Sequence, residues 1–408
     1  MYKILISCYA CSPNRGSEPG MGWNFVKGIS QFHEVHVIVE QEKWEQEILT
    51  YTAENPKETE NLHFYFIKKK RNRKLRKIWP PSYYYFYRQW QKEAYQLAVE
   101  LNQKENFDLV HQLNMVGFRE PGYLWKMKVP FVWGPIGGMV NTPWRFFSEF
   151  DFYGKLFYGG RNVLNSLQQY YLRRPKKAAL SKNSMLIAAT PDNKQFIKKL
   201  WNKNAVIIAE VGSEKVQTNV NVRNKNTCIN IVWSGQHTSG KALNILLMSL
   251  SKLPKDVDWK LNILGTGKMT NKWKALAIKL GINENCNWKG WLTQPEALEV
   301  MSKGHVFCIT SLKDLTSTVT LEALSFGLPI VCLDHCGFSH VVNDSCGIKI
   351  PVTTPKEAKN GFAKAVEKLY ADENLRQKLA KGALVRAKDF SWEKKINKLN
   401  EIYQSLLQ

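Results

Sequence analysis

The sequence predicts an α/β protein built from two doubly wound, Rossmann-like parallel-sheet domains. Two series of short, nearly continuous apolar segments alternate with helical stretches, a pattern typical of parallel strands covered on both faces. A polar stretch between the two series, residues 213–227, contains almost no large apolar side chains and predicts a linker. With 408 residues, of which 44% are hydrophobic, the chain is long enough for two globular domains.

The first series opens with the strand KILISCYA and a helix from about Pro19 to Phe32, which Ser17 is expected to cap. Further helices are predicted at Tyr87–Gln103 and Asp192–Leu200. The remaining strands predicted in this half are EVHVIVE, LHFYFIK, FDLVHQL, PFVWGP, SMLIAAT and AVIIAEVG. We expect residues 1–215 to form the first domain.

The second series is predicted to form a domain from residue 216 to 390. Its expected strands are INIVWSG, WKLNILG, NCNWKGWL, HVFCITS, LPIVCLD and GIKIPV, and its helices include Ala242–Ser251, Asn271–Leu280, Pro295–Lys303 and Val319–Phe326. Thr354 and Glu357 form a capping box that opens a further helix. A C-terminal helix, residues 391–408, is expected to pack back on the first domain. The strand ends of both sheets should face a central cleft, where ligands bind in such folds.

The net charge of +23 favours anionic partners such as phosphorylated ligands, nucleic acid or an anionic membrane. Neither a signal peptide nor a membrane-spanning run is predicted, because the N-terminal apolar run is short and no run approaches 18 apolar residues. Eight scattered cysteines suggest reduced thiols of a cytoplasmic protein. The pair Cys8/Cys11 leaves a strand and the pair Cys332/Cys336 has no matching partner cluster, so no metal site is predicted.

The segment SLKDLTSTVTLEALSFGLP, residues 311–329, is the most informative stretch. Asp314 precedes Glu322 by eight residues, and small hydroxyl residues lie between them. An acid at a strand end, a loop of free backbone N–H groups and an acid in the first turns of a helix can hold a sugar, a diphosphate and a ribose in that order. This arrangement favours a nucleotide-sugar transferase.

In each half, a glycine-containing loop follows the first strand. Gly16 lies in RGSEPG and allows a close backbone approach at a helix start, which suits an anion, although an ordinary strand–helix turn would look the same. Gly235 lies in WSGQHTSGK, and Lys241 of this loop is close enough to the strand end to reach a phosphate. A solvated lysine in the first helical turn is the alternative. The glycine spacing is not that of a P-loop.

Other strand exits offer weaker candidates. Gly265 lies in LGTGK, and Trp288, Lys289 and Gly290 end a strand in a way that suits the edge or face of a base, unless the tryptophans belong to the core. His111 ends the strand FDLVHQL and is expected to point toward the cleft.

The stretch Lys68–Arg88 holds nine basic residues, no acid and a run of aromatic side chains. Basic charges attract anionic lipids, and aromatic rings favour the headgroup level, so an anionic membrane surface is the favoured partner. A solvated charged face with buried tyrosines and a single-stranded nucleic-acid site are alternatives. Because no RNA-binding signature accompanies the stretch, we expect no nucleic-acid partner.

Taken together, these loops resemble retaining glycosyltransferases of family 4, which have the GT-B fold. The resemblance covers nearly the whole chain and includes the motifs GSEPGMGWNF, FDLVHQLN, FVWGPIGG, WSGQHTSGKAL, GWL and DLTSTVTLEALSFGLPIV.

The resemblance implies a role for each matching position. Glu322 would bind the ribose hydroxyls, and Asp314 would contact the donor sugar near the reacting carbon. Lys241 and backbone N–H groups would hold the diphosphate. The expected catalytic residues are Asp314, Lys241 and His111; the expected donor-binding residues are Gly16, Gly137, Gly235, Gln236, His237, Lys241, Gly265, Trp288, Lys289, Gly290, Asp314, Leu315, Thr316, Ser317, Thr318 and Glu322.

Three positions depart from the family pattern. Asp314 replaces the usual Glu, and Gln236 stands where an Arg usually grips the diphosphate. The usual His near the sugar is missing from WGPIGG, where glycines such as Gly137 could offer N–H groups instead. His237 could replace the missing positive charge.

The expected function is therefore retaining transfer of a sugar from a nucleoside-diphosphate sugar to a glycan or lipid-linked glycan in cell-surface polysaccharide biosynthesis. No metal or other cofactor is expected besides the donor, and the expected location is cytoplasmic, peripheral on the inner face of the cell membrane. A non-catalytic GT-B subunit that binds nucleotide sugar or glycan, and a nucleotide-sugar epimerase, are the alternatives.

Overall fold

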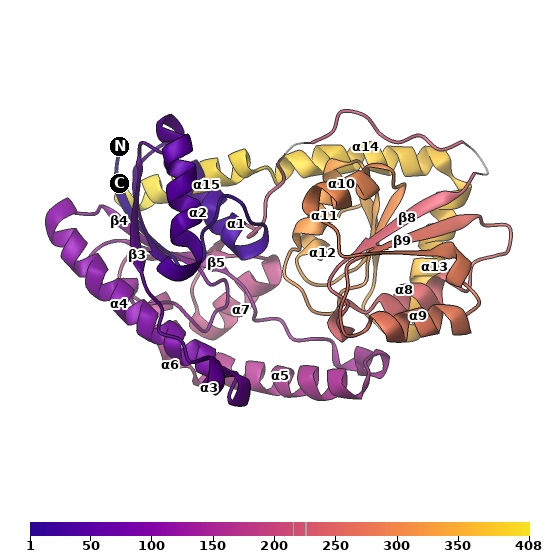
Figure 1. Ribbon diagram of the computed structural model, residues 1–408, viewed down its shortest axis with the longest axis horizontal. Coiled ribbons are helices and arrows are strands. Elements are labelled where there is room, and N and C mark those ends of the chain that lie inside the picture. Colours follow the sequence, from indigo (N-terminus) through magenta and orange to yellow (C-terminus); the bar gives the residue numbers. More distant parts are fainter. Residues whose placement is uncertain (215, 225–226) are drawn as a thin grey trace. The chain divides into compact units, whose positions relative to one another are not determined.

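The computed structural model describes residues 1–214, 216–224 and 227–408 (Figure 1). Residues 215, 225 and 226 of the expected linker lie outside the described part. The chain forms two compact units, each discontinuous in sequence. The first contains Met1–Met139, Gln168–Gly212 and Trp392–Gln408, and the second contains Val140–Leu167 and Ser213–Ser391.

The first unit is built on a seven-stranded parallel sheet with the order β3-β2-β1-β4-β5-β6-β7. Its strands are β1 (Lys3–Cys8), β2 (Glu34–Glu40), β3 (Leu62–Ile67), β4 (Leu109–Asn114), β5 (Phe131–Ile136), β6 (Ser184–Ala188) and β7 (Ala205–Ile207). The central strands β1, β4 and β5 are buried along nearly their whole length, which agrees with their continuous apolar sequences.

Helices cover both faces of this sheet (Figure 1). Those of the first unit are α1 (Ser17–Ile29), α2 (Gln41–Glu54), α3 (Arg73–Ile78), α4 (Ser82–Glu105), α6 (Arg173–Ala179), α7 (Pro191–Trp201) and α15 (Trp392–Leu407). Helix α15 packs on α1, where Trp392 meets Phe25 edge to face with 5.2 Å between ring centroids. Helix α1 begins at Ser17, so the predicted Ser17 cap is wrong. Gly16 occupies the N-cap position instead, without a side-chain hydrogen bond.

Helix α5 (Phe152–Tyr171) was not predicted, and it runs from the segment of the second unit into that of the first. It follows a 3₁₀ segment, η3 (Trp144–Glu149). Its apolar side chains are spaced to form a stripe, yet many of them are exposed, including Tyr153, Leu156 and Phe157.

The second unit repeats the same winding in a six-stranded parallel sheet with the order β10-β9-β8-β11-β12-β13. Its strands are β8 (Ile229–Ser234), β9 (Trp259–Leu264), β10 (Cys286–Gly290), β11 (Val306–Ile309), β12 (Ile330–Leu333) and β13 (Gly347–Ile350). The strand order reverses between β8 and β11, and this switch point is where open α/β sheets bind ligands.

The helices of the second unit lie on both faces of its sheet (Figure 1). They are α8 (Leu243–Leu250), α9 (Thr270–Lys279), α10 (Gln294–Ser302), α11 (Thr318–Ser325), α12 (Phe338–Val341), α13 (Pro355–Ala371) and α14 (Glu373–Asp389). Helix α13 packs on α8, and α14 packs on α11. Thr354 caps α13 as predicted, because its side chain accepts a hydrogen bond from the backbone N–H of Glu357.

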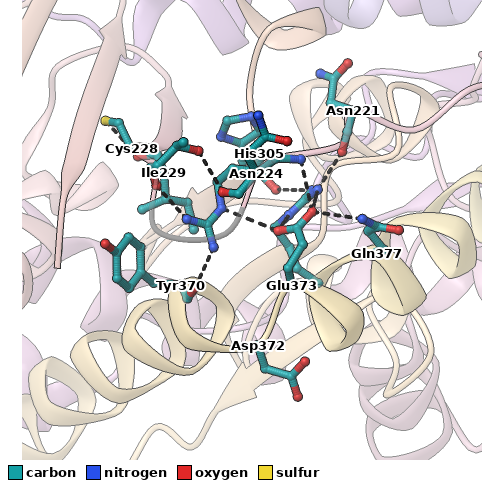
Figure 2. Close-up of polar contacts among 12 residues, drawn as sticks. Asn221, Asn224, Cys228, Ile229, His305, Tyr370, Asp372, Glu373 and Gln377 are labelled. Atoms are coloured by element: carbon teal, nitrogen blue, oxygen red, sulfur yellow. Dashed lines mark hydrogen bonds and ion pairs between the residues drawn. The ribbon is translucent and has the colours of Figure 1, made fainter.

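A buried ionic network ties part of the expected linker to α14. Glu373 accepts hydrogen bonds from both Arg223 and Arg376, whose side chains are each 1% exposed (Figure 2). Arg376 also donates to the carbonyl of Asn221, and the Asn221 amide donates to the carbonyl of Gly304 at 3.0 Å, just before β11. Residues 221–223 are therefore part of the folded second unit.

Candidate functional site

The residues predicted to bind the donor gather mainly at one edge of the second sheet. They follow the C-terminal ends of β10, β9, β8 and β11, which are consecutive neighbours in that sheet. Because parallel strands end at the same edge, the four loops form one continuous rim at the switch point.

Lys241 and Asp314 form an ion pair at this edge, with the Lys241 Nζ 2.5 Å from the Asp314 Oδ2. Their side chains are 20% and 18% exposed, so both can be reached by a ligand. The other Asp314 oxygen, Oδ1, accepts a hydrogen bond of 3.0 Å from the N–H of Leu315. A cation held by a carboxylate at a sheet edge can exchange that partner for a phosphate oxygen.

Buried hydrogen bonds position Lys241. Its carbonyl accepts a bond of 2.8 Å from the hydroxyl of Thr310, and that hydroxyl accepts one of 3.1 Å from the indole N–H of Trp233. Thr310 and Trp233 are buried. Lys241 ends a 3₁₀ turn, η4 (Ser239–Lys241), and Ala242 has φ 48°, so the lysine lies in the loop before α8 and not in its first turn. Sequence reasoning missed Thr310, although a hydroxyl residue at a strand end was a usable signal.

The loop from Leu315 to Thr318 leads into α11 through Ser317, which has φ 68° and caps the helix without a side-chain hydrogen bond. Gly337 approaches this loop so closely that an added Cβ would lie 2.7 Å from the Thr316 hydroxyl. The backbone N–H groups of this loop were expected to be free to bind the diphosphate. The first of them differs, because the Leu315 N–H already donates to the Asp314 carboxylate.

Glu322 lies one turn into α11 and accepts a hydrogen bond of 3.1 Å from the side chain of Gln294, the first residue of α10. Burial raises the pKa of the Glu322 carboxyl. Such a partly desolvated acid, with its second oxygen available, is suited to accept hydrogen bonds from neighbouring hydroxyl groups. Gln294 was not predicted as a site residue.

The glycine loops use their amides to extend the sheet. The N–H of Gly235 donates to the carbonyl of Leu264, and the N–H of Gly265 donates to the carbonyl of Gly290. Gly265 has φ 109°, and a Cβ there would meet the Gly235 carbonyl oxygen at 2.1 Å, which excludes any other residue. Gln236 and Lys289 are exposed beside these turns.

His237 is buried beneath the loops at this sheet edge and is not exposed to a ligand. Its Nδ1 is 2.8 Å from the Thr270 hydroxyl, and burial lowers the pKa of the ring to about 4. The ring is therefore neutral at pH 7 and does not supply the positive charge that Gln236 lacks. Trp288 packs near it, with 6.0 Å between ring centroids. The buried indole N–H of Trp288 has no hydrogen-bond partner within the described part of the chain.

Three predicted residues belong to the first unit. Gly16 is exposed at the start of α1. Gly137 donates its N–H to the carbonyl of Val116 at 2.7 Å, so this amide is not free for a donor sugar as the sequence suggested.

The expectation that His111 points into a cleft is wrong. His111 is buried, its Nδ1 is 2.6 Å from the Tyr403 hydroxyl, and its Nε2 is 2.8 Å from the carbonyl oxygen of Gly134. Burial lowers the pKa of this ring to about 4. Both ring nitrogens are thus occupied inside the first unit, and we leave His111 outside the proposed catalytic residues.

The two doubly wound sheets define the GT-B fold of glycosyltransferases. The crystal structure of WaaG, a glycosyltransferase involved in lipopolysaccharide biosynthesis, matches 98% of this chain with a TM-score of 0.59 and 17% identity, over 99% of its own length. HepE from Anabaena, solved in complex with UDP, matches 99% of the chain with a TM-score of 0.63 and 14% identity, over 100% of its length. The predicted fold class is confirmed.

Residues 217–386 match the model of the family glycosyl transferases group 1, which confirms the predicted resemblance for this part of the chain. The lipopolysaccharide core biosynthesis glycosyltransferase LpsE of Rhizobium meliloti is 26% identical over 151 residues, 37% of this chain and 42% of that protein. An uncharacterised glycosyltransferase of Methanocaldococcus jannaschii is 20% identical over 388 residues, 95% of this chain and 97% of that protein.

The chain spans less than half the length of the first two curated relatives, LpsE and a D-inositol 3-phosphate glycosyltransferase of Streptomyces bingchenggensis, of which 29% is matched. Membership of family 4 in particular stays a prediction.

Proposed function

We propose that this protein is a retaining glycosyltransferase that moves a sugar from a nucleoside-diphosphate sugar to a glycan or lipid-linked glycan. The observation that carries the proposal is the pair of Lys241 and Asp314 at the switch point of the second sheet, with Glu322 one turn into the following helix. A cation for the diphosphate and two acids for hydroxyl groups are the three functions that donor binding requires.

The relatives support this choice of substrates. HepE was solved with UDP-glucose, and a matching protein of Campylobacter jejuni transfers N-acetylgalactosamine to a diphospho-undecaprenol-linked sugar, by its name. The names of WaaG and LpsE refer to lipopolysaccharide biosynthesis. For this chain, cell-surface polysaccharide biosynthesis is the corresponding proposal.

In the proposed reaction, the bond between the anomeric carbon and the diphosphate oxygen breaks, and the acceptor oxygen bonds to the same face of that carbon. The acceptor proton goes to the departing diphosphate, and no resident cofactor takes part. Lys241, released from Asp314, stabilises the negative charge on the leaving group, an effect that for one well-placed donor amounts to roughly 10²–10³ in rate. Asp314 then faces the sugar hydroxyls and Glu322 the ribose.

A thermal-shift screen against nucleotide sugars, followed by transfer assays, tests the proposal. A ligand at 100 times its dissociation constant raises stability by about 2.7 kcal/mol. Lys241→Ala and Glu322→Ala should reduce that shift and the turnover, whereas Lys303→Ala should change neither, because Lys303 is an exposed lysine of a surface pair with Glu299. Nucleotide binding without turnover on any acceptor would instead support a non-catalytic subunit, and a changed nucleotide sugar without acceptor would indicate an epimerase.

We also propose that the protein associates with an anionic membrane at the cytoplasmic face. In the stretch Lys68–Arg88, Ile78 is 85% exposed and Trp79, Tyr84 and Tyr85 are about half exposed. Residues 152–180, which include α5, contain six basic residues and no acid beside an exposed apolar stripe. No helix in the described ranges is long and apolar enough to cross a bilayer.

Flotation with vesicles that contain anionic lipid tests the membrane proposal. Each basic residue near the surface contributes about 1 kcal/mol, so changing the exposed Lys68, Lys70, Lys74 and Lys77 to Gln should weaken binding by several orders of magnitude. Unchanged flotation of that variant would refute the role of this stretch. Reducing the apolar stripe with Leu156→Ser tests α5 separately.

A further inference from the structure

The first unit contains a basic pocket at the C-terminal ends of β1, β2 and β3, three neighbouring strands. Its lining comes from the residue after β1, the first turn of α2, the segment after β3, the last turn of α3 and the start of α4. The lining residues are Tyr9, Lys43, Lys69, Arg71, Asn72, Arg76, Ser82, Tyr83 and Phe86. Four of them are cationic and none is acidic.

The charges of this pocket are only partly neutralised by the protein. Buried Glu40 and nearby Glu42 both pair with Arg71. Among the ion pairs of the described residues, Lys43, Lys69 and Arg76 have no carboxylate partner. The pocket therefore carries excess positive charge next to a carboxylate that is already engaged.

Lys69 is the most unusual of these cations, because it is only 2% exposed. Its Nζ donates to the Tyr9 hydroxyl at 3.2 Å and lies 3.5 Å from the centroid of the Tyr83 ring. Burial, and then the charge of Arg71, lower the pKa of this amine to about 7. Aromatic rings alone compensate a buried ammonium only in part, and a bound anion would compensate it further.

Ser82 supplies a second and independent indication of a ligand. It is fully buried, it lines the pocket, and its hydroxyl has no hydrogen-bond partner within the described part of the chain. It is also the first residue of the 24-residue helix α4, whose N-terminal end favours negative charge. A buried hydroxyl without a protein partner, beside cations that have no carboxylate partner in the described residues, is suited to bind an anion.

We propose that this pocket binds a phosphate or diphosphate group of the acceptor. This assignment rests on the proposed function. It narrows the acceptor to a phosphorylated glycan or a glycan linked to lipid through a diphosphate. Lys69, Arg76 and the Ser82 hydroxyl would contact the anion, and Tyr83 and Phe86 would pack against the group that carries it. In the stretch Lys68–Arg88, Lys69, Arg71 and Arg76 line this pocket, whereas the exposed Lys68, Lys70, Lys74 and Lys77 lie outside its lining.

Calorimetric titration of the full chain with inorganic pyrophosphate tests the site without any turnover. The titration uses a Lys241→Ala background, so that the donor site does not add to the signal. Lys69→Met and Arg76→Gln should each weaken binding at least tenfold, and Ser82→Ala severalfold. Lys74→Gln, an exposed residue of α3 outside the lining, is the matched control and should not change it. Binding that is absent, or equal in all variants, would mean that the lysine and tyrosines serve only the fold.

Two further measurements, with Lys241 intact, separate the sources of the phosphate. Lys69→Met should raise KM for a diphosphate-linked acceptor at least tenfold with little change in kcat, and should leave a neutral glycan acceptor unaffected. If the same variant instead loses vesicle flotation and keeps its KM, the pocket binds a phospholipid headgroup and the acceptor assignment is overturned. Pyrophosphate binding that depends on Lys69 in a protein without transferase activity would retain the site and reject the proposed function.

A different observation carries a second proposal, at the outer edge of the same sheet. Glu34 and His36 of β2 lie beside His63 of β3, and His36 and His63 are register partners. The Glu34 Oε1 is 3.2 Å from the His36 Nε2 and 3.4 Å from the His63 Nε2. Ligand atoms bound at about 2.0–2.1 Å to a tetrahedral zinc ion are about 3.3 Å apart, which matches both distances from Glu34, and all three ligand atoms lie within 4.8 Å of one another.

The surroundings also suit a metal. The Nδ1 of His36 is 2.9 Å from the Tyr65 hydroxyl, the kind of outer contact that orients metal-binding imidazoles. His36 is buried among the neighbouring side chains, while His63 is exposed and gives an ion access. We infer that Glu34, His36 and His63 form a zinc site with one position open to water. The bound ion would link the edge strand β3 to β2.

Titration of untagged protein with Zn²⁺, and absorption spectra with Co²⁺, test this site. One equivalent should bind and give a nitrogen- and oxygen-ligand spectrum without a thiolate band. His36→Ala and His63→Ala should abolish it, Tyr65→Phe should weaken it roughly 10–100-fold, and Glu105→Gln, a neighbouring carboxylate paired with Lys3, should not affect it. Unchanged stoichiometry in both histidine variants would overturn the proposal.

Discussion

Replacing Glu373 by Gln should destabilise the second unit strongly, because it leaves two buried arginines without their carboxylate partner. Glu373 is 14% exposed and accepts five hydrogen bonds, two of them at 2.5 and 2.8 Å from Arg376. Removing one member of a buried ion pair typically costs about 3–5 kcal/mol.

The pKa of Glu373 gives a second way to work out how much this network contributes to the free energy of unfolding. Burial alone would raise it, but the hydrogen bonds from Arg376 and Arg223 hold the pKa at about 2, below the ordinary value of 4.5. At about 1.4 kcal/mol per pH unit, this difference contributes about 3 kcal/mol of stability at pH 7. Because the folded pKa is lowered, the contribution is complete above pH 4.5 and is lost as the pH falls toward about 2, so about half of it remains at pH 3.

Urea unfolding followed by tryptophan fluorescence, at pH 7 and pH 3, measures both effects. Glu373→Gln should lower the free energy of unfolding by about 3–5 kcal/mol at pH 7, and the gap to the native protein should narrow by about 2 kcal/mol at pH 3. Glu299→Gln is the matched control, since Glu299 and Lys303 are 66% and 72% exposed and such pairs contribute about 0.5 kcal/mol. A loss below 1 kcal/mol in Glu373→Gln, or a gap independent of pH, would refute this reasoning.

Three other substitutions test the site and its supports. Thr310→Val removes the hydrogen bonds to the Lys241 carbonyl and the Trp233 indole. Melting curves should therefore show a loss of about 1–3 kcal/mol in stability, and calorimetry should show weaker binding of the nucleotide sugar. Gly337→Ala places a Cβ 2.7 Å from the Thr316 hydroxyl and should weaken nucleotide binding at least tenfold; calorimetric affinity equal to that of the native protein would contradict the proposed loop. His111→Phe should lower thermal stability by about 1–3 kcal/mol but keep kcat within severalfold, whereas a hundredfold fall in kcat would return His111 to the catalytic residues.

The fold and most candidate residues could be predicted because their signals are local. Each strand is a short apolar run, and Lys241 and Asp314 follow strand ends directly, so the parallel sheet alone brings them together. The two residues of this ion pair are 73 positions apart in sequence, but each could be placed from the strand that precedes it.

The misses depend on distant partners. His111 was expected at a strand end, but it lies inside β4, and its Nδ1 is bonded to the hydroxyl of Tyr403, 292 residues later in the sequence. Arg223 lies in a polar stretch, but it is buried in an ion pair with Glu373. That partner lies 150 residues later in the sequence, so the local pattern gives no sign of it. Helix α5 was missed because Gly159 and Gly160 interrupt its pattern and its apolar stripe does not face a core.

The most direct test of the central claim is transfer of a labelled sugar from the nucleotide sugar that stabilises the protein to a diphosphate-linked glycan, with the product configuration determined by NMR. The native protein should give a product with the donor's anomeric configuration, and Lys241→Ala should be at least a hundredfold slower, while Lys303→Ala should match the native rate. A product with inverted configuration, or a Lys241→Ala rate equal to that of the native protein, would contradict the proposed function.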